Sequence, residues 1–347
     1  MTMRERVGVA VVGFGYWGPN HVRVFTENQD SELLMLCDKS ASRLASAQRR
    51  YPSLLCTPRF EDALADPRVQ AMVIATPVST HFELARRALE AGKHVLVEKP
   101  LATSSREAAA LIALARKRRR VLMVGHTFVY SPPVMKVKQL LEQKSLGRIF
   151  HMDFSRVNLG LFQPDANVLW DLGPHDVSIA LYWLGRPPLA VRAQAHSFVR
   201  KGIEEVGYIS MDFPNGILVH NHVSWLAPVK LRRVSITGSR KMLVYDDTAN
   251  IEKVKIYDQG VVKNPRTFGE FQLTYRSGDI YSPKIDSDEP LALQCADFMA
   301  SIRTGRAPRS DGELGLQVVR VIEAAQESLK RKGESVRLSA PPRSRGG

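Results

Sequence analysis

The feature that most constrains the fold is an alternation of short apolar runs with helical patterns between residues 7 and 124. Because the runs are continuously apolar, they predict strands that are buried on both faces. Such strands separated by amphipathic helices form a doubly wound parallel sheet. The predicted strands are VGVAVV, ELLMLC, AMVIAT, HVLVE and VLMV, and the predicted helices are 19–26, 41–50, 80–91 and 104–117.

A glycine loop joins the first predicted strand to the first predicted helix. Gly13, Gly15 and Gly18 fit the pattern G-x-G-x-x-G. In this context Gly13 permits a tight turn, Gly15 lets the backbone approach a pyrophosphate, and Gly18 lets the helix pack against the strand. The loop therefore predicts a Rossmann dinucleotide site, to which we also assign the intervening Tyr16 and Trp17.

Asp38 ends the second predicted strand, about 20 residues after the loop, as this fingerprint requires. A carboxylate there accepts hydrogen bonds from the ribose hydroxyls and repels a 2′-phosphate, which favours NAD. The neighbouring Lys39 and Ser40 would tolerate a phosphate, so NADP is the alternative. A purely structural alternative for Asp38 is an acidic residue at a helix N-terminus.

The pattern changes after a helical stretch at 132–143. Turn residues in PNG and GSR separate alternating runs, which predicts a largely antiparallel sheet followed by two helices. We therefore expect an α/β domain over 1–124, an α+β domain for substrate binding and oligomerisation over 125–337, and a disordered tail over 338–347. The predicted strands are 148–157, 189–199, 207–213, 217–225, 231–237 and 242–245, and the helices are 290–303 and 312–332.

The composition and charge restrict the classes of partner that the chain is expected to bind. The net charge is +14, but the densest basic run, at 116–120, ends a predicted helix, and no helix-turn-helix or stacking-aromatic signature accompanies it. We expect no nucleic-acid partner. No apolar run approaches the roughly 18 residues of a membrane span and no cleavage site follows the start, so we expect no membrane association and a cytoplasmic protein. Cys37, Cys56 and Cys295 are too far apart for a disulfide framework or zinc site.

Two further stretches follow predicted strands, ATPVSTH at 75–81 and VLVEKP at 95–100. With the glycine loop, they make the sequence resemble the glucose-fructose oxidoreductase, inositol dehydrogenase and rhizopine catabolism (Gfo/Idh/MocA) family of NAD(P)-dependent oxidoreductases, over almost the whole chain. The resemblance implies that Lys99 meets both the nicotinamide ribose and a substrate hydroxyl. It also implies that Thr76, Pro77, His81 and Glu98 border the cofactor.

The family's D-x-x-x-H motif matches Asp171 and His175, whose spacing predicts that both project from one face of a helix start. A neutral imidazole suits removal of a hydroxyl proton during hydride transfer, and Lys99 would stabilise the alkoxide. Asp171 would either orient the imidazole or bind a neighbouring hydroxyl. The structural alternative is a helix N-cap at Asp171 and an ordinary surface histidine.

Further candidates for substrate contact lie near this motif. Asn158, Gln163 and Asn167 are polar loop residues suited to sugar hydroxyls. Tyr130 is another candidate, in GHTFVYSPP, where the family often carries Asn and Arg and this chain has His126 and Tyr130. His220 and His222 share a strand face without a third ligand, so we assign no metal.

NVLWDLGPHDVSI and the segment 222–247 resemble a branch of the family that acts in sugar-nucleotide pathways. This resemblance implies a UDP-N-acetylhexosamine, or its uronate, that is oxidised at the ring 3-position. The cations at 230, 232, 233, 240 and 241 would hold its pyrophosphate. The alternatives are an inositol or free-sugar dehydrogenase, and a regulator that binds NAD without turnover.

An apolar series in the second half predicts oligomerisation. Ile217, Val219, Val223 and Trp225 suggest more apolar surface than the chain's own helices cover. We therefore expect a homodimer or homotetramer formed through the open face of the second sheet.

Overall fold

The computed structural model describes residues 6–160, 162, 166–263 and 273–338. Gln163 and the tail residues 339–347 lie outside this range. The chain divides into two compact units, Met1–Ser131 with Asp288–Val319, and Pro132–Ser287 with Arg320–Gly347. Each unit is therefore discontinuous, whereas the boundaries expected from the sequence were continuous. None of the helices in the described ranges is both long and apolar enough to cross a membrane.

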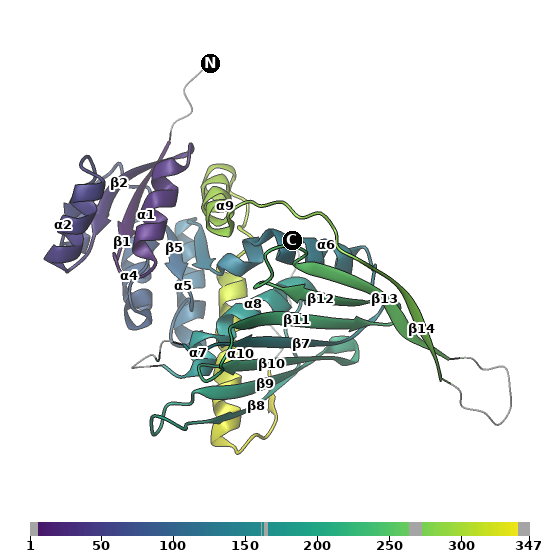
Figure 1. Cartoon of the computed structure of the whole chain (residues 1–347). Coiled ribbons are helices and arrows are strands. Elements are labelled where there is room, and N and C mark those ends of the chain that lie inside the picture. The colour runs from purple at the N-terminus through teal and green to yellow at the C-terminus, as the bar shows by residue number, and fades with distance from the viewer. Residues whose placement is uncertain (1–5, 161, 163–165, 264–272, 339–347) are drawn as a thin grey trace. The chain divides into compact units, whose positions relative to one another are not determined.

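The first unit contains a six-stranded sheet in the order β3-β2-β1-β4-β5-β6, in which every pair is parallel (Figure 1). The predicted Rossmann fold is confirmed. The order reverses between β1 and β4, which is where such sheets bind ligands. The strands are β1 Val7–Val12, β2 Ser31–Cys37, β3 Leu55–Thr57, β4 Ala71–Ile74, β5 His94–Glu98 and β6 Leu122–Gly125.

Every residue of β1 and β4 is buried, which explains their uninterrupted apolar runs. The helix α2 follows its predicted range, and Ser40 caps it by accepting from the N–H of Arg43. β3 and α3, which are both short, were not predicted from the sequence. The helical segments are α1 Gly18–Glu27, α2 Ala41–Arg50, α3 Phe60–Ala65, η1 Val78–Thr80, α4 His81–Glu90, α5 Ser105–Arg118 and η2 Thr127–Tyr130.

The segment Asp288–Val319 completes the first unit after the chain has built the second sheet. It contains α9 Pro290–Thr304 and the first part of α10 Gly312–Lys330. The N–H of Val124 on β6 donates to the carbonyl of Ser310 at 2.8 Å, so this returning segment pairs with the edge of the sheet.

The second unit contains a nine-stranded sheet in the order β14-β13-β12-β11-β7-β10-β9-β8-β15. The prediction of a largely antiparallel sheet is confirmed, because only β7 and β10 pair in parallel. The elements are α6 Pro132–Glu142, β7 Ile149–Val157, α7 Val168–Asp171, α8 Gly173–Leu184, β8 Ala190–His196, β9 Val206–Phe213, η3 Pro214–Gly216, β10 Ile217–Ser224, β11 Leu231–Gly238, β12 Met242–Asp246, β13 Val254–Lys263, β14 Leu273–Tyr281 and β15 Val336–Arg337.

The apolar series that suggested an open oligomer face is buried within the chain. Ile217 is 9% exposed, Val219 and Val223 are inaccessible, and α7 and α8 pack against β10 on this side. The intervening positions point to the opposite face, where Tyr208 is 52% exposed and stacks on His222 with 4.4 Å between ring centroids. The premise of the oligomer prediction was therefore wrong, because one chain's helices do cover these residues.

Candidate functional site

The glycine loop has the backbone geometry of a phosphate cradle. Gly13 has a φ of 96°, and a Cβ there would lie 2.5 Å from the carbonyl oxygen of Ala75. A Cβ on Gly18 would lie 2.1 Å from the carbonyl oxygen of Gly13, so the helix packs tightly on the turn. Gly15, by contrast, faces open space. Because α1 also has no side-chain cap, its first N–H groups suit an anion, and these residues fit a dinucleotide pyrophosphate.

Asp38 also organises this loop. Its Oδ2 accepts from the N–H of Phe14 at 2.6 Å, and its Oδ1 accepts from the N–H of Ser40 at 2.8 Å. The guanidinium of Arg43 lies 3.6 Å away, and only 7% of the Asp38 side chain is exposed. The carboxylate is thus held in place by the backbone on both sides. The N-terminal cap of α2 is Ser40, so Asp38 does not have the capping role of its structural alternative.

Glu98 connects the dinucleotide helix to Lys99. Its Oε1 accepts from the Nε2 of His21 on α1 at 2.7 Å, and its Oε2 accepts from the N–H of Lys99 at 3.2 Å. His21 is fully buried and Glu98 is 6% exposed. A Cβ on Gly125 would lie 2.9 Å from the same Oε2, which explains the glycine that ends β6. His21 was not among the predicted site residues. The one sequence feature that points to it is its position in the helix that follows the glycine loop.

His126, which sequence reasoning left without a role, lies in the field of Lys99. It directly follows β6 and is 1% exposed. Among the described residues neither of its ring nitrogens has a hydrogen-bond partner. Burial, and secondly the charge of Lys99, lower the pKa of His126 to about 3, so the imidazole is neutral at physiological pH. A buried, unsatisfied imidazole is uncommon in native structures and indicates a site for a ligand or water.

His81 is buried between the loops that follow β4 and β5. It is 1% exposed, and its ring nitrogens lie 2.8 Å from the carbonyl oxygen of Pro100 and 2.9 Å from that of Thr76. Burial lowers the pKa of His81 despite these two contacts. The side chain therefore connects the loop after β4 to the loop after β5, and its expected place beside the nicotinamide stays a prediction. Thr76 is half-buried and Pro77 is exposed, so both remain candidates for the cofactor wall.

Asp171 and His175 do not share one helix, which corrects the expected geometry. Asp171 ends α7, Leu172 links the two segments, and His175 lies in the first turn of α8. Both side chains are half-buried. The Oδ2 of Asp171 accepts from the indole Nε1 of Trp225 at 3.0 Å. Trp225 is 1% exposed and was seen in the sequence only as an apolar residue.

A buried ion pair supports the helix that carries His175. Arg156 on β7 donates through Nε and Nη2 to Oδ1 of Asp176, at 2.9 and 2.7 Å. The side chains of Arg156 and Asp176 are 7% and 3% exposed. Because Asp176 is adjacent to His175 in the sequence, this pair anchors the start of α8 on the sheet.

The other two polar candidates for substrate contact, Asn158 and Asn167, have different surroundings. Asn158 adjoins Trp225, since both side chains would approach within 3.4 Å of a Cβ built on Gly160. Asn167 instead caps α7, and its amide nitrogen donates to Glu204 at 2.8 Å and Gln326 at 2.9 Å. Both of its amide hydrogens are thereby used, which corrects its expected role.

Tyr130 also serves the fold. It is 1% exposed, its hydroxyl donates to Asp297 at 2.8 Å, and it accepts from the N–H of Ser310 at 3.0 Å. Its burial raises the pKa of the phenol. Tyr130 thus fastens the returning segment of the first unit and does not offer a free hydroxyl to a substrate.

The five cations that were expected to hold a pyrophosphate lie at two ends of a hairpin. Leu231, next to Lys230, pairs with Val157, whereas Gly238, which precedes Arg240 and Lys241, pairs with Ile149 at the other end of β7. Arg232 is already paired with Asp247 at 3.3 Å. The expectation of a single cluster was therefore wrong.

Two family models match the chain. Residues 7–126 match "Oxidoreductase family, NAD-binding Rossmann fold", and residues 134–244 match "GFO/IDH/MocA C-terminal domain". The UDP-N-acetylglucosamine 3-dehydrogenase of Acidithiobacillus ferrooxidans is 30% identical over 89% of this chain and 93% of its own length. The chain belongs to the Gfo/Idh/MocA oxidoreductase family. It is an NAD(P)-dependent oxidoreductase that acts on CH–OH groups, and its first unit is the NAD-binding domain.

Other relatives of this Gfo/Idh/MocA protein differ in their named substrates. The scyllo-inositol 2-dehydrogenase (NADP(+)) IolW of Bacillus subtilis is 26% identical over 94% of this chain and 95% of its own length. Among solved structures, GenD2 from gentamicin A biosynthesis, in complex with NAD, has a TM-score of 0.82 and 26% identity, with 98% of each chain covered.

Proposed function

We propose that this enzyme oxidises a ring carbinol of a nucleotide-linked sugar, at the 3-position, with NAD. The observation that carries the substrate class is the match along 89% of the chain to a relative named UDP-N-acetylglucosamine 3-dehydrogenase. The position of Lys99 supports the proposed reaction. Lys99 follows a strand of the NAD-binding sheet, and its N–H donates to Glu98, which is hydrogen-bonded to His21 on α1. The free thiols of the three cysteines are in keeping with a cytoplasmic enzyme.

In this proposal the residues move one proton and stabilise one charge. His175 accepts the proton of the substrate hydroxyl, and Lys99 stabilises the alkoxide as it forms. NAD, when bound, accepts the hydride from the same carbon, so that the products are a keto sugar, NADH and a proton. Asp171 is held by Trp225 and either orients His175 or binds a neighbouring hydroxyl. Asn158, beside Trp225, is the remaining polar candidate for a sugar hydroxyl.

A substrate panel tests the proposal. UDP-, dTDP- and GDP-sugars are compared with inositols and free hexoses by NADH absorbance, with a keto acid added in a parallel series to recycle a cofactor that stays bound. We expect turnover with a UDP-sugar. Turnover of myo-inositol alone would support the second candidate, an inositol dehydrogenase, which the relative named scyllo-inositol 2-dehydrogenase favours. NAD binding without any turnover would support a regulator.

Site variants test the residue roles. Lys99→Met and His175→Ala should each lower kcat by roughly 10²- to 10⁴-fold while NAD affinity stays within a factor of about two, because neither is assigned to the adenosine half. His220→Ala is a matched control, since His220 is an exposed histidine that contacts Ser210 at 2.9 Å. Wild-type turnover in His175→Ala would remove this histidine from the mechanism.

We further propose that the chain forms a homodimer or homotetramer through the sheet face that carries Tyr208 and His222. The support is the exposed aromatic stack on that face. Light scattering should report a multimer at micromolar concentration, and Tyr208→Asp should lower its mass. A wild-type monomer would contradict this proposal.

A further inference from the structure

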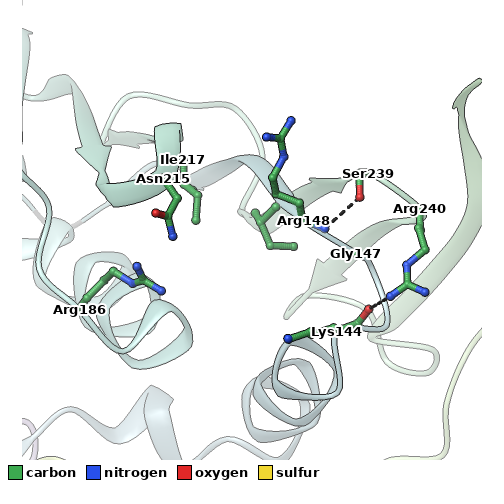
Figure 2. Close-up of a pocket in the computed structure, with 9 residues that line it drawn as sticks. Lys144, Gly147, Arg148, Arg186, Asn215, Ile217, Ser239 and Arg240 are labelled. Carbon is green, nitrogen blue, oxygen red and sulfur yellow. Dashed lines mark hydrogen bonds between the residues drawn. The ribbon is translucent and has the colours of Figure 1, made fainter. Parts of the chain in front are cut away.

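A basic cavity lies in the second unit, and none of its lining residues is assigned to the proposed reaction. Its volume is about 650 Å³, and Figure 2 shows the nine residues that line it. Ile149 and Ile217 begin β7 and β10, whereas Asn158 and Trp225 follow the opposite ends of these strands. At 3.3 Å per residue, the length of β7 separates Ile149 from Asn158 by roughly 30 Å. The cavity therefore is not the substrate subsite of Asp171.

The lining carries four cations and no acid. Lys144, Arg148, Arg186 and Arg240 surround the cavity, and none of its nine lining residues is Asp or Glu. Arg148 lies over the ring of Phe150 at 5.1 Å, and Arg186 has one long contact of 3.4 Å with a main-chain carbonyl. Within the described ranges neither of these arginines pairs with a carboxylate. Most surface arginines of the first unit, by contrast, have such partners, for example Arg86 with Glu83 and Glu90.

Backbone hydrogen bonds fix the frame that carries these charges. The N–H of Arg148 donates to Oγ of Ser239 at 2.9 Å, and the N–H of Ser239 donates back to the carbonyl of Arg148 at 2.8 Å. The guanidinium of Arg240 donates to the carbonyl of Lys144 at 2.9 Å. Gly147 has a φ of 78°, and a Cβ there would lie 2.4 Å from Oγ of Ser239. The two loops thus require glycine to approach this closely, and they fix the main-chain positions from which Lys144, Arg148 and Arg240 extend.

The size and lining of the cavity limit the class of ligand that it can bind. Its volume lies within the range of small-molecule pockets, about 300 to 1,000 Å³. Ile217 is 9% exposed and supplies an apolar floor, while Asn215 offers an amide to an organic group. One guanidinium group binds two phosphate oxygens at once. Several neighbouring cations therefore suit a ligand with adjacent phosphate groups.

We propose that this cavity, which we call the Arg148–Arg186 pocket, binds a small molecule that carries a pyrophosphate group, such as a nucleoside diphosphate. Its lining residues differ from those assigned to the NAD site and to the proposed substrate site. Its occupancy does not depend on which sugar the enzyme oxidises.

Calorimetric titration of the NAD-saturated protein tests the proposal, because saturation removes the competing pyrophosphate site of the glycine loop. The probes are inorganic pyrophosphate, ADP and, as a single-charge-centre comparison, inorganic phosphate, in about 50 mM salt, where charge contacts are only partly screened. The test variant is Arg148→Gln/Arg186→Gln. The matched control is Lys117→Gln/Arg118→Gln, which removes two exposed cations of α5 that do not line this cavity.

We expect one equivalent of pyrophosphate or ADP per chain whose affinity falls tenfold or more in the pocket variant and less than twofold in the control, whether or not the proposed substrate site takes up a further equivalent. Tighter binding of ADP than of pyrophosphate would support a contact between the adenosine of ADP and the part of the cavity that contains Asn215. Equal loss in both variants, undiminished binding in the pocket variant, or no binding to the wild type at 1 mM would each overturn the proposal. A change in mass of the pocket variant by light scattering would also overturn it, because the cations would then serve a subunit interface. Failure of the sugar panel leaves these titrations unaffected, so the two proposals can fail separately.

Discussion

Asp38 supports the glycine loop, and we assign it a second role in cofactor choice, so one substitution tests both roles. Its carboxylate accepts from the N–H groups of Phe14 and Ser40, and its side chain is 7% exposed. Asp38→Ala leaves both donors without their acceptor. An unsatisfied buried donor costs about 1 to 3 kcal/mol; because both N–H groups are only part-buried, the two together should lower the free energy of unfolding of the first unit by about 2 to 4 kcal/mol. The glycine loop itself loses one of its supports.

The same change should alter cofactor choice. Removing the carboxylate removes its hydrogen bonds to the ribose and its repulsion of a 2′-phosphate. We therefore expect NAD affinity to fall by tenfold or more, NADP affinity to fall less, and the preference for NAD to narrow. Nicotinamide fluorescence measures both affinities, and urea unfolding followed by far-ultraviolet circular dichroism measures stability.

Two further variants, a conservative substitution and a control, test this prediction more specifically. Asp38→Asn keeps one acceptor and should lose about half as much stability. Asp66→Ala removes a carboxylate that accepts from the N–H of Arg68 away from the glycine loop, and it should leave cofactor affinity unchanged. The reasoning is refuted if Asp38→Ala unfolds within about 0.5 kcal/mol of the wild type, or if the wild type prefers NADP.

Three other variants address the interior of the two units. Arg156→Met should destabilise the protein by about 3 to 5 kcal/mol in urea unfolding because it strands the buried Asp176, and Asp176→Leu added to it should restore much of that loss. His126 has a folded pKa of about 3, below its unfolded value of 6.5, so its contribution to stability is complete above pH 6.5 and is lost as the pH falls toward 3. His126→Phe should reduce the pH slope of unfolding between pH 4.5 and 6 by about 1.4 kcal/mol per unit, and an unchanged slope would contradict a neutral buried imidazole. Trp225→Phe removes the hydrogen bond to Asp171 and should lower kcat/KM by roughly tenfold without changing NAD affinity, whereas unaltered kcat/KM would dissociate this bond from catalysis.

The sequence by itself determined the first sheet and its glycine loop. A strand such as Val7–Val12 is buried on both faces, so its burial is written in consecutive residues and needs no knowledge of distant partners. The same holds for Gly13, where a φ of 96° disfavours a side chain, and for Gly18, where the nearby carbonyl of Gly13 excludes one. The short β3 and the β13–β14 hairpin escaped prediction, because brief or half-exposed strands leave a weak local pattern.

Only the tertiary structure decided which polar residues are available to a ligand. Tyr130, Asn167 and His81 resemble binding residues in the sequence, yet their hydrogen bonds are used by segments up to 180 residues away. His126 looked incidental, but burial without a partner makes it a candidate for the site.

The same limit applies to the second sheet. Period-two alternation assigned Val219 and Val223 to one face of β10 but did not reveal that α7 and α8 cover that face. The cations of the Arg148–Arg186 pocket come from three segments that are separate in the sequence, after α6, after α8 and between β11 and β12. Spacing along the chain records periodicity and local backbone constraint, whereas the covering of a face and the gathering of charges depend on which distant segments pack together.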